Sequence, residues 1–247
     1  MPKELESVLI GSSIFDCSSS TTSKTYRCIK ENETFFCKEG STELLLRENE
    51  MYRYFYQFNL GPEVLYFTTV GVKSYIITRS LKGSDGVSKN NINDPEKLAF
   101  IFGKGLAAIH NMPSICCPFQ NRTNEMYNQA IQNINSGIYA EYLIPEGFIE
   151  GKKKFEQLCN IGVSECVIHG DYCLPNIIID NQQISGFIDL GNGGFGDSHY
   201  DLFWGLWTLH YNLKTRKYDD IFLKAYGLEK IDNDRIEFNR LISGFMD

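Results

Sequence analysis

The first 80 residues contain short runs of β-favouring side chains separated by turn-forming residues. The runs predict strands at 8–11, 25–29, 34–38, 64–69 and 73–78. Glu31-Asn32 and Gly71 lie at expected turns between neighbouring runs. This part of the chain is therefore predicted to form a small antiparallel sheet.

Residues 43–57 interrupt the strands, because their apolar side chains recur at helical spacing. These positions are Leu44, Leu45, Met51, Tyr52 and Phe55. The sequence Asn59-Leu-Gly-Pro62 is typical of a helix end. One helix is expected between the third and fourth strands.

Helical patterns dominate the second part of the chain. Asp94 and Pro95 are typical of a helix N-cap and first turn, and one apolar stripe follows them as far as His110. Weaker helical patterns cover 124–135 and 145–160. His110 is more typical of a core or helix-end residue than of a ligand, because no second His or Cys lies at metal-ligand spacing.

Residues 177–188 read as two short antiparallel strands around the polar turn 180–183. Asn176 enters the first strand and Asp189 leaves the second, so both lie at the same end of the hairpin. An amide oxygen and a carboxylate placed together suit Mg²⁺, which prefers oxygen ligands. Asp171 would face the same volume from the preceding loop, where it could accept a proton.

Each of these residues alone has an ordinary structural explanation. A His-x-Asp is usually a capped turn, an Asn before a strand is usually turn chemistry, and an Asp after a strand is usually a helix cap. The spacing of His169, Asp171, Asn176 and Asp189 together favours a phosphoryl-transfer site instead.

Composition and charge narrow the class of protein. A chain of 247 residues with 43% apolar side chains can bury one sizeable core or two small lobes. A net charge of −7 and a pI near 5.2 argue against nucleic-acid binding and for a cationic or neutral partner. No apolar run approaches the length of a membrane span, so we expect no membrane association.

The eight cysteines include no Cys-x-x-Cys pair, and no apolar signal segment stands at the start. Reduced thiols and a cytoplasmic location are expected. Cys173 lies within the proposed catalytic loop, where a packing role is favoured over a reactive thiol.

A Ser/Thr-rich segment at 16–23 follows the first expected strand. Its backbone N–H groups and hydroxyls could hold phosphate oxygens, and the candidates are Ser18, Ser19, Ser20 and Thr21. A flexible linker is the alternative explanation.

Alternation along 34–38 places Phe36 and Lys38 on one strand face. That pair suits a nucleotide, with the ammonium at the phosphates and the ring against the purine. A strand-end lysine that extends into solvent is the alternative. Glu48 lies on or beside the inward face of the helix at 43–57, where an acidic residue could hold Lys38 by an ion pair.

The segments His169-Gly-Asp-x-x-x-x-Asn176 and Ile188-Asp-Leu-Gly191 resemble the catalytic loop and metal-binding motif of aminoglycoside phosphotransferases, most closely the 3′-phosphotransferases. The resemblance extends from about Ile10 to the last helix and is strongest over 167–202. It implies an α+β fold similar to protein kinases, with a nucleotide-binding lobe at 1–80 and a catalytic lobe at 81–247. It also implies ATP and Mg²⁺ as cofactors.

The resemblance implies roles for individual residues. Glu48, rather than Glu43 or Glu50, is expected to orient Lys38, and His169 to support the catalytic loop. Backbone groups of Ser80 and Leu81 would contact adenine, and Asp201 would brace the loop that bears Asp171.

The expected acceptor is an aminoglycoside, phosphorylated at its 3′-hydroxyl by a monomeric enzyme that confers antibiotic resistance. Only about a dozen residues separate Asp189 from an apolar helix, which leaves no room for a peptide-binding activation segment. Candidates for binding substrate ammonium groups, besides Asp171, are Glu141, Glu146 and Asp247, although any one of them could be ordinary helix surface.

Two features depart from the family pattern. Asn192 replaces the arginine that usually follows Ile-Asp-Leu-Gly, and the acidic C-terminal end is reduced to Asp247. A kinase acting on another small molecule and a nucleotide-binding pseudokinase therefore stay open as alternatives.

Overall fold

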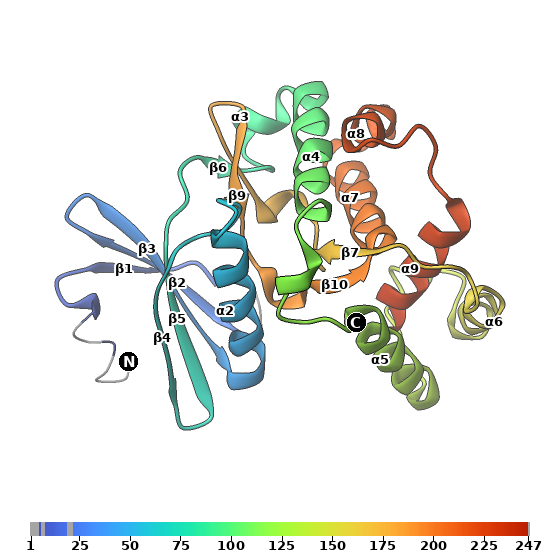
Figure 1. The fold of residues 1–247 in the computed structure, drawn as a ribbon, viewed down its shortest axis with the longest axis horizontal. Helices are drawn as coiled ribbons and strands as arrows, with labels where there is room; N and C mark the ends of the chain where they lie inside the picture. Colours follow the sequence, from blue (N-terminus) through green and yellow to red (C-terminus); the bar gives the residue numbers. More distant parts are fainter. Residues whose placement is uncertain (1–4, 6–7, 19–21, 247) are drawn as a thin grey trace.

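The computed structural model describes residues 5, 8–18 and 22–246. A sheet with one helix lies beside a larger, mostly helical part, and the chain passes from one to the other after β5 (Figure 1). This arrangement confirms the α+β class predicted from the sequence.

The N-terminal part is a five-stranded antiparallel sheet with the strand order β1-β2-β3-β5-β4. Its strands are β1 (Ser13–Asp16), β2 (Lys24–Lys30), β3 (Glu33–Ser41), β4 (Val64–Val70) and β5 (Lys73–Arg79). Glu31 and Gly71, at the two predicted turns, have φ angles of 54° and 63°. The strands predicted from residue 25 onward are thus confirmed.

The strand predicted at 8–11 is wrong. Val8 and Leu9 are helical, and the first strand begins at Ser13. Leu5 and Leu9, four residues apart, are buried in one apolar cluster with residues of the sheet. That spacing places both side chains on one face of a helical turn, so their burial outweighs the β-preference of the segment.

Helix α2 (Thr42–Tyr56) lies between β3 and β4, as predicted. Ser41 is its N-cap, and the Ser41 hydroxyl accepts a hydrogen bond from the Leu44 N–H at 3.4 Å. Leu45, Met51 and Phe55 are completely buried on its inner face.

The C-terminal part contains short strands and 3₁₀ turns among its helices. The strands are β6 (Ser84–Asp85), β7 (Glu165–Ile168), β8 (Ile177–Asp180), β9 (Gln183–Phe187) and β10 (Gly194–Asp197). The helices are α3 (Lys89–Ile92), α4 (Pro95–His110), α5 (Arg122–Ser136), α6 (Phe148–Leu158), α7 (Ser198–Leu213), α8 (Asp219–Tyr226) and α9 (Asn233–Met246). The 3₁₀ turns are η1 (Ser114–Cys116), η2 (Leu174–Asn176) and η3 (Leu190–Asn192).

Helix α4 and the β8–β9 hairpin follow the sequence prediction closely. The Asp94 side chain accepts a hydrogen bond from the Lys97 N–H, and Pro95 occupies the first turn of α4. Strands β8 and β9 pair antiparallel around Asn181 and Gln182, which have φ angles of 47° and 62°. Two successive positive φ angles suit the twist of a two-residue hairpin.

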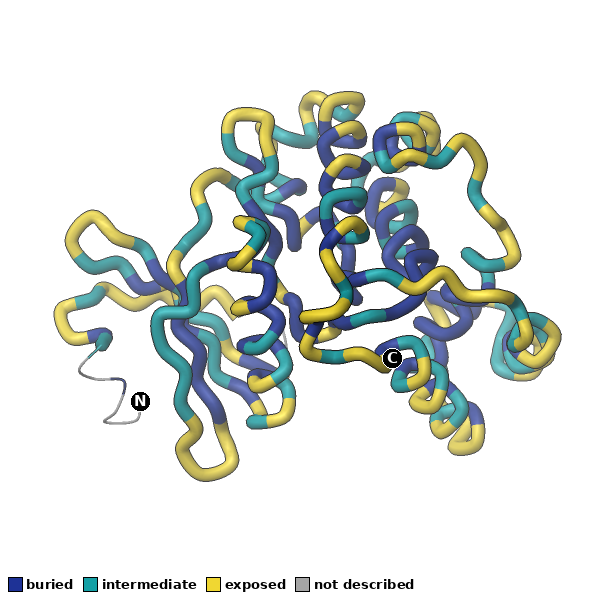
Figure 2. The backbone as a smooth tube through the Cα atoms, viewed as in Figure 1, coloured by how far each residue is buried: buried dark blue, intermediate teal, exposed yellow. Residues whose placement is uncertain are grey.

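The main apolar core crosses the junction between the two parts. Met51 and Phe55 of α2 belong to the same buried cluster as Phe102 of α4 and Phe187 of β9. Buried backbone accordingly follows α4, α7 and the inner strand β5 in Figure 2. The lobe division at residues 80 and 81 stays a prediction, and this shared core holds the proposed lobes together.

No helix of the described residues is long and apolar enough to cross a membrane.

Candidate functional site

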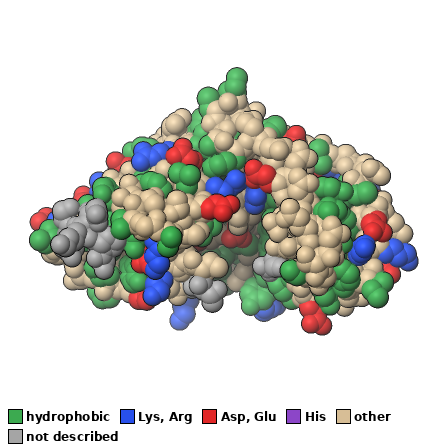
Figure 3. Space-filling model, turned by 90° about the horizontal axis from the view of Figure 1, so that it is seen from below, with side chains coloured by type: hydrophobic (Ala, Val, Ile, Leu, Met, Phe, Trp, Pro, Cys, Tyr) green, Lys and Arg blue, Asp and Glu red, His purple; other side chains and the backbone are tan. Residues whose placement is uncertain are grey.

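A cavity of about 610 Å³ lies where the sheet meets the helical part. It is lined from the sheet side by Phe36 and Lys38 and from the hairpin side by Asn176 and Asp189. Figure 3 shows a hollow between the two halves of the molecule, with charged side chains gathered beside it. The structure therefore brings together groups that the sequence analysis placed in separate elements.

Lys38 occupies the centre of the charged part of this cavity. Its Nζ lies 2.9 Å from Glu48 Oε2 and 2.7 Å from Asp189 Oδ1. Burial alone would lower the pKa of Lys38, but the two carboxylates outweigh this effect and raise the pKa. The amine thus remains charged, and the predicted ion pair with Glu48 is present.

The strand register explains why Lys38 points inward. Phe35 and Cys37 are 9% and 2% exposed on one face of β3, where they join the apolar cluster of the sheet. Alternation then turns Phe36 and Lys38 to the opposite face, toward the cavity.

Tyr52 links Glu48 to Asp189, the predicted metal ligand. Its hydroxyl donates to Glu48 Oε1 at 2.8 Å and accepts from the Asp189 N–H at 3.0 Å. Asp189 has a φ of 57°, a left-handed conformation in which this buried phenol helps to hold it. The sequence analysis treated Tyr52 only as an apolar helix position, although its i, i+4 spacing from Glu48 could have indicated the contact.

The catalytic loop is closed by its own hydrogen bonds. Asn176 Nδ2 donates to both the carbonyl oxygen and Oδ2 of Asp171, each at 2.9 Å. Among the described residues, no hydrogen bond to the amide oxygen of Asn176 is present, so this oxygen can face a cation. His169 is fully buried, and its Nδ1 accepts from the Asp171 N–H at 3.2 Å, which fits the supporting role expected of it.

Asp201 holds the start of the same loop. Its two carboxylate oxygens accept hydrogen bonds from the N–H groups of His169 at 2.7 Å and Gly170 at 2.9 Å. The side chain is completely buried, and His110 Nε2 lies 3.3 Å from Oδ2. Asp201 therefore braces the loop, and His110 is a core residue, as the sequence analysis expected.

Two arginines that the sequence analysis did not identify hold the segment after Asp189. Arg47 contacts the carbonyl oxygens of Gly191 and Gly193, both at 3.4 Å, and Arg122 Nε donates to that of Asn192 at 2.9 Å. Both guanidinium groups also lie 3.2 Å from Glu125. We refer to Arg47, Arg122 and Glu125 as the arginine clamp.

The clamped segment contacts the catalytic loop directly. Gly170 has a φ of 79°, and a Cβ added there would lie 2.0 Å from the carbonyl oxygen of Asn192. Glycine is therefore required, and a shift of the Asn192 peptide would be transmitted to the neighbouring Asp171. Arg47 and Arg122 supply guanidinium groups to a segment that has no arginine at position 192 itself.

The Ser/Thr-rich loop is only partly described. Ser19, Ser20 and Thr21 lie outside the described residues. Ser18 is exposed, and its Oγ accepts a hydrogen bond from the Thr25 N–H at 3.0 Å, while its own N–H donates to Asp16. Cys17 and Thr25, rather than Ser18, line the cavity from this side.

Ser80 and Leu81 line the cavity where the chain leaves β5. The Ser80 N–H already donates to the Thr34 carbonyl at 3.0 Å. Within the described residues, the Leu81 N–H makes no such backbone bond, so it is the donor that this segment offers to a ligand.

Glu141 and Glu146, two of the predicted substrate acids, do not line the cavity. Glu141 is exposed on the segment between α5 and α6. Partial burial would raise the pKa of Glu146, but hydrogen bonds from Arg240 and Lys154 lower it to about 2. Glu146 thus has two cationic partners that tie α9 to α6, and Asp247 lies outside the described residues.

Cys173 is partly buried, and a packing role for it stays a prediction. Burial strongly raises the pKa of its thiol, and Asp171 adds to this effect. A thiol held in the protonated form is a poor nucleophile.

Comparisons with known proteins show which family this chain is similar to. Residues 17–238 match the Phosphotransferase enzyme family (APH). A probable aminoglycoside 3′-phosphotransferase of Lactococcus lactis subsp. lactis is 32% identical over 246 residues, which cover 96% of this chain and 91% of the relative.

Solved structures show the same fold. The crystal structure of an aminoglycoside-3′-phosphotransferase of type VIII superposes with a TM-score of 0.84 at 21% identity, covering 98% of this chain and 97% of that one. Aminoglycoside phosphotransferase APH(3″)-Id from Streptomyces rimosus, in complex with ADP and streptomycin, superposes with a TM-score of 0.75 at 19% identity. That match covers 98% of this chain and 96% of the other. The two-lobe, kinase-like fold expected from the sequence is confirmed.

Proposed function

The chain belongs to the phosphotransferase enzyme family, and on that premise we propose that it transfers the γ-phosphoryl group of ATP to a hydroxyl of an aminoglycoside. The observation that carries this proposal is the Lys38 ammonium held between Glu48 and Asp189 in a cavity that Asn176 also lines. Lys38 and Asp189 are 151 positions apart in the chain. An ion pair with a purely structural role would not require the Asn176 amide and the Glu48 carboxylate beside it.

The cavity fits a nucleotide and one divalent cation. Its volume lies within the range typical of small-molecule sites, and its lining combines apolar walls with a few charged groups. The described residues contain no cluster of three or more His, Cys, Asp or Glu side chains that could hold a metal. Mg²⁺ does not need one, because one carboxylate, one amide oxygen and substrate phosphates can hold it.

Each residue has a proposed role in this reaction. Asn176 and Asp189 would hold Mg²⁺, which supplies charge neutralisation at the phosphates when bound. Lys38, oriented by Glu48, would bind the phosphates, and the Leu81 backbone would contact adenine. Asp171, whose carboxylate is oriented by the Asn176 amide, would accept or orient the proton of the acceptor hydroxyl.

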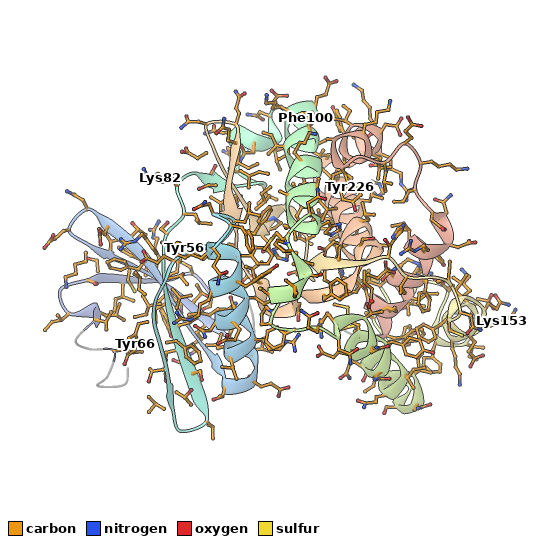
Figure 4. All side chains as sticks on the ribbon, viewed as in Figure 1. Tyr56, Tyr66, Lys82, Phe100, Lys153 and Tyr226 are labelled. Carbon is orange, nitrogen blue, oxygen red and sulfur yellow. The ribbon has the colours of Figure 1, made fainter. Side chains whose placement is uncertain are left out.

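Replacement of Lys38 by alanine is expected to lower kcat/KM for ATP about 30- to 100-fold, through both a higher KM and a lower kcat. The loss follows from removing one charge-assisted phosphate contact, worth about 2–3 kcal/mol. Steady-state ADP release at varied ATP measures it. The control is Lys153→Ala, an exposed lysine on α6 that is labelled in Figure 4. Equal kinetics for the two variants would contradict the role of Lys38.

Loss of an arginine of the arginine clamp should slow the reaction less than loss of Lys38. Arg47→Ala is expected to lower kcat about tenfold with little change in KM for ATP, because the clamp holds the segment after Asp189 without lining the cavity. Arg53→Ala, an exposed arginine on the same helix, is the matched control. The clamp has no positioning role if both variants keep the kcat of the unchanged chain.

The 3′-hydroxyl of an aminoglycoside is the acceptor that we propose, because the Lactococcus relative is named for that reaction. The test is acceptor-dependent ADP release with Mg·ATP across a panel of aminoglycosides, followed by ³¹P NMR of the product to locate the phosphate. Nucleotide binding without acceptor-dependent ADP release would favour a pseudokinase. If ADP is released only with a different small hydroxyl compound, that compound is the acceptor and the aminoglycoside is not.

The cysteines support the location expected for this protein. All eight cysteines are free, which agrees with the reducing cytoplasm that we propose as its location. We also propose a monomer that binds small molecules rather than nucleic acid. A resistance role follows if expression of the chain raises the aminoglycoside concentration that a sensitive bacterium survives.

A further inference from the structure

Aromatic rings form a row along one side of α7. Trp204 and Trp207 lie with their ring centroids 5.4 Å apart, and Trp207 stacks on Tyr211 at 5.0 Å with an interplanar angle of 8°. Tyr142, from the segment between α5 and α6, approaches Trp207 at 6.4 Å. We refer to Tyr142, Trp204, Trp207 and Tyr211 as the aromatic row.

The aromatic row begins beside the catalytic loop. Thr208, which follows Trp207, accepts a hydrogen bond from the Leu174 N–H at 3.3 Å. The Cys173 thiol lies between the side chains of Thr208 and Asp171 and interacts with both. The helical turn that carries Trp207 is therefore the turn on which the loop bearing Asp171 rests.

The outer rings of the row are exposed. Tyr142 is 59% exposed and Tyr211 57% exposed, so a sugar ring can reach them from solvent.

The row already binds an ammonium group of the protein itself. Lys214 Nζ lies 4.3 Å from the centroid of the Tyr211 ring. Flat aromatic faces attract cations electrostatically and pack well against the apolar face of a sugar ring. The exposed carboxylate of Glu141, adjacent to Tyr142, adds negative charge at this end of the row.

We propose that the aromatic row binds an ammonium-bearing sugar ring of the acceptor while the hydroxyl to be phosphorylated lies at Asp171. This proposal rests on the proposed function and specifies how its acceptor is held. Glu146, one of the predicted substrate acids, is occupied by Arg240 and Lys154. Aromatic faces would supply the affinity instead.

Intrinsic tryptophan fluorescence can detect binding at the aromatic row, because Trp204 and Trp207 are the only two tryptophans of the sequence. Kanamycin added to the full chain should change tryptophan emission in a saturable way, and trehalose, a disaccharide without amines, should not. The proposal is overturned if kanamycin leaves the emission unchanged, or if both sugars change it equally. Because binding is read without turnover, this result is separate from the test of phosphoryl transfer.

Substitutions in the row test its contribution to specificity. Tyr211→Ser should raise KM for kanamycin about 3- to 30-fold, the range of one cation–π contact, with kcat and KM for ATP unchanged. Tyr211→Phe keeps the ring and should restore KM to within about twofold. The control is Tyr56→Ser, an exposed tyrosine on α2 in the other part of the molecule (Figure 4).

The outcomes of the two experiments are distinguishable. If the unchanged chain phosphorylates kanamycin and Tyr211→Ser keeps its KM, the aromatic row is refuted while the proposed function stands. If kanamycin changes the tryptophan emission but no ADP is released, the row is supported and phosphoryl transfer to this acceptor fails.

Discussion

Replacement of Asp171 by asparagine is expected to lower kcat about 10³-fold while nucleotide affinity stays within about twofold. A positioned general base contributes roughly 10²–10⁴ to the rate, and an amide cannot accept the proton of an acceptor hydroxyl. Asp171 does not line the cavity proposed to bind the nucleotide, so the binding of ATP should be preserved. Acceptor-dependent ADP release measures the first quantity, and calorimetric titration with ADP measures the second.

Asp180→Asn provides the matched control for this variant. Asp180 ends β8, at the far end of the hairpin from Asn176, and its carboxylate contacts only the neighbouring Asn181 among the described residues. The same substitution there should leave kcat unchanged. If Asp171→Asn turns over at the rate of Asp180→Asn, Asp171 is not the base and the proposed mechanism is wrong.

Asp201→Ala is expected to reduce the free energy of unfolding by about 3–5 kcal/mol, the largest stability effect that the site offers. The substitution leaves the buried N–H groups of His169 and Gly170 without acceptors, and each such group costs about 1–3 kcal/mol. It also removes the partner of His110, whose Nδ1 hydrogen-bonds to the hydroxyl of Tyr226 (labelled in Figure 4). A fall in the urea midpoint measures the loss.

The control for this stability prediction is Asp220→Ala, an exposed aspartate on α8. It should change the free energy of unfolding by less than about 0.5 kcal/mol, as surface substitutions usually do. A small effect of Asp201→Ala, comparable to that of Asp220→Ala, would show that the loop is held by other contacts.

Local patterns predicted much of the fold. Alternation assigned Lys38 to the cavity face of β3, and the turn residues 180–183 predicted the hairpin that brings Asn176 and Asp189 to one end. Strand period, helix period and capping residues act over a few positions, so a sequence displays them directly. The catalytic loop was recognisable for the same reason, since its residues lie close together in the chain.

Local patterns failed where packing competed with them. The segment 8–11 favours a strand by composition, yet Leu9 is helical because it shares a buried cluster with the sheet. Glu146 was a reasonable substrate residue by charge, yet Arg240 of α9, 94 positions away, holds its carboxylate. Neither outcome follows from neighbours in the sequence.

Residue types and their periodicity thus predicted the class of fold, the hairpin and the candidate reacting groups. Only the folded chain decided that Lys38 forms an ion pair with Asp189, that Arg47 and Arg122 bind successive carbonyl oxygens, and that Thr208 of α7 contacts the predicted catalytic loop. The physical reason is that backbone preferences depend on adjacent residues, whereas ion pairs and ring contacts depend on which distant surfaces bury their apolar faces together.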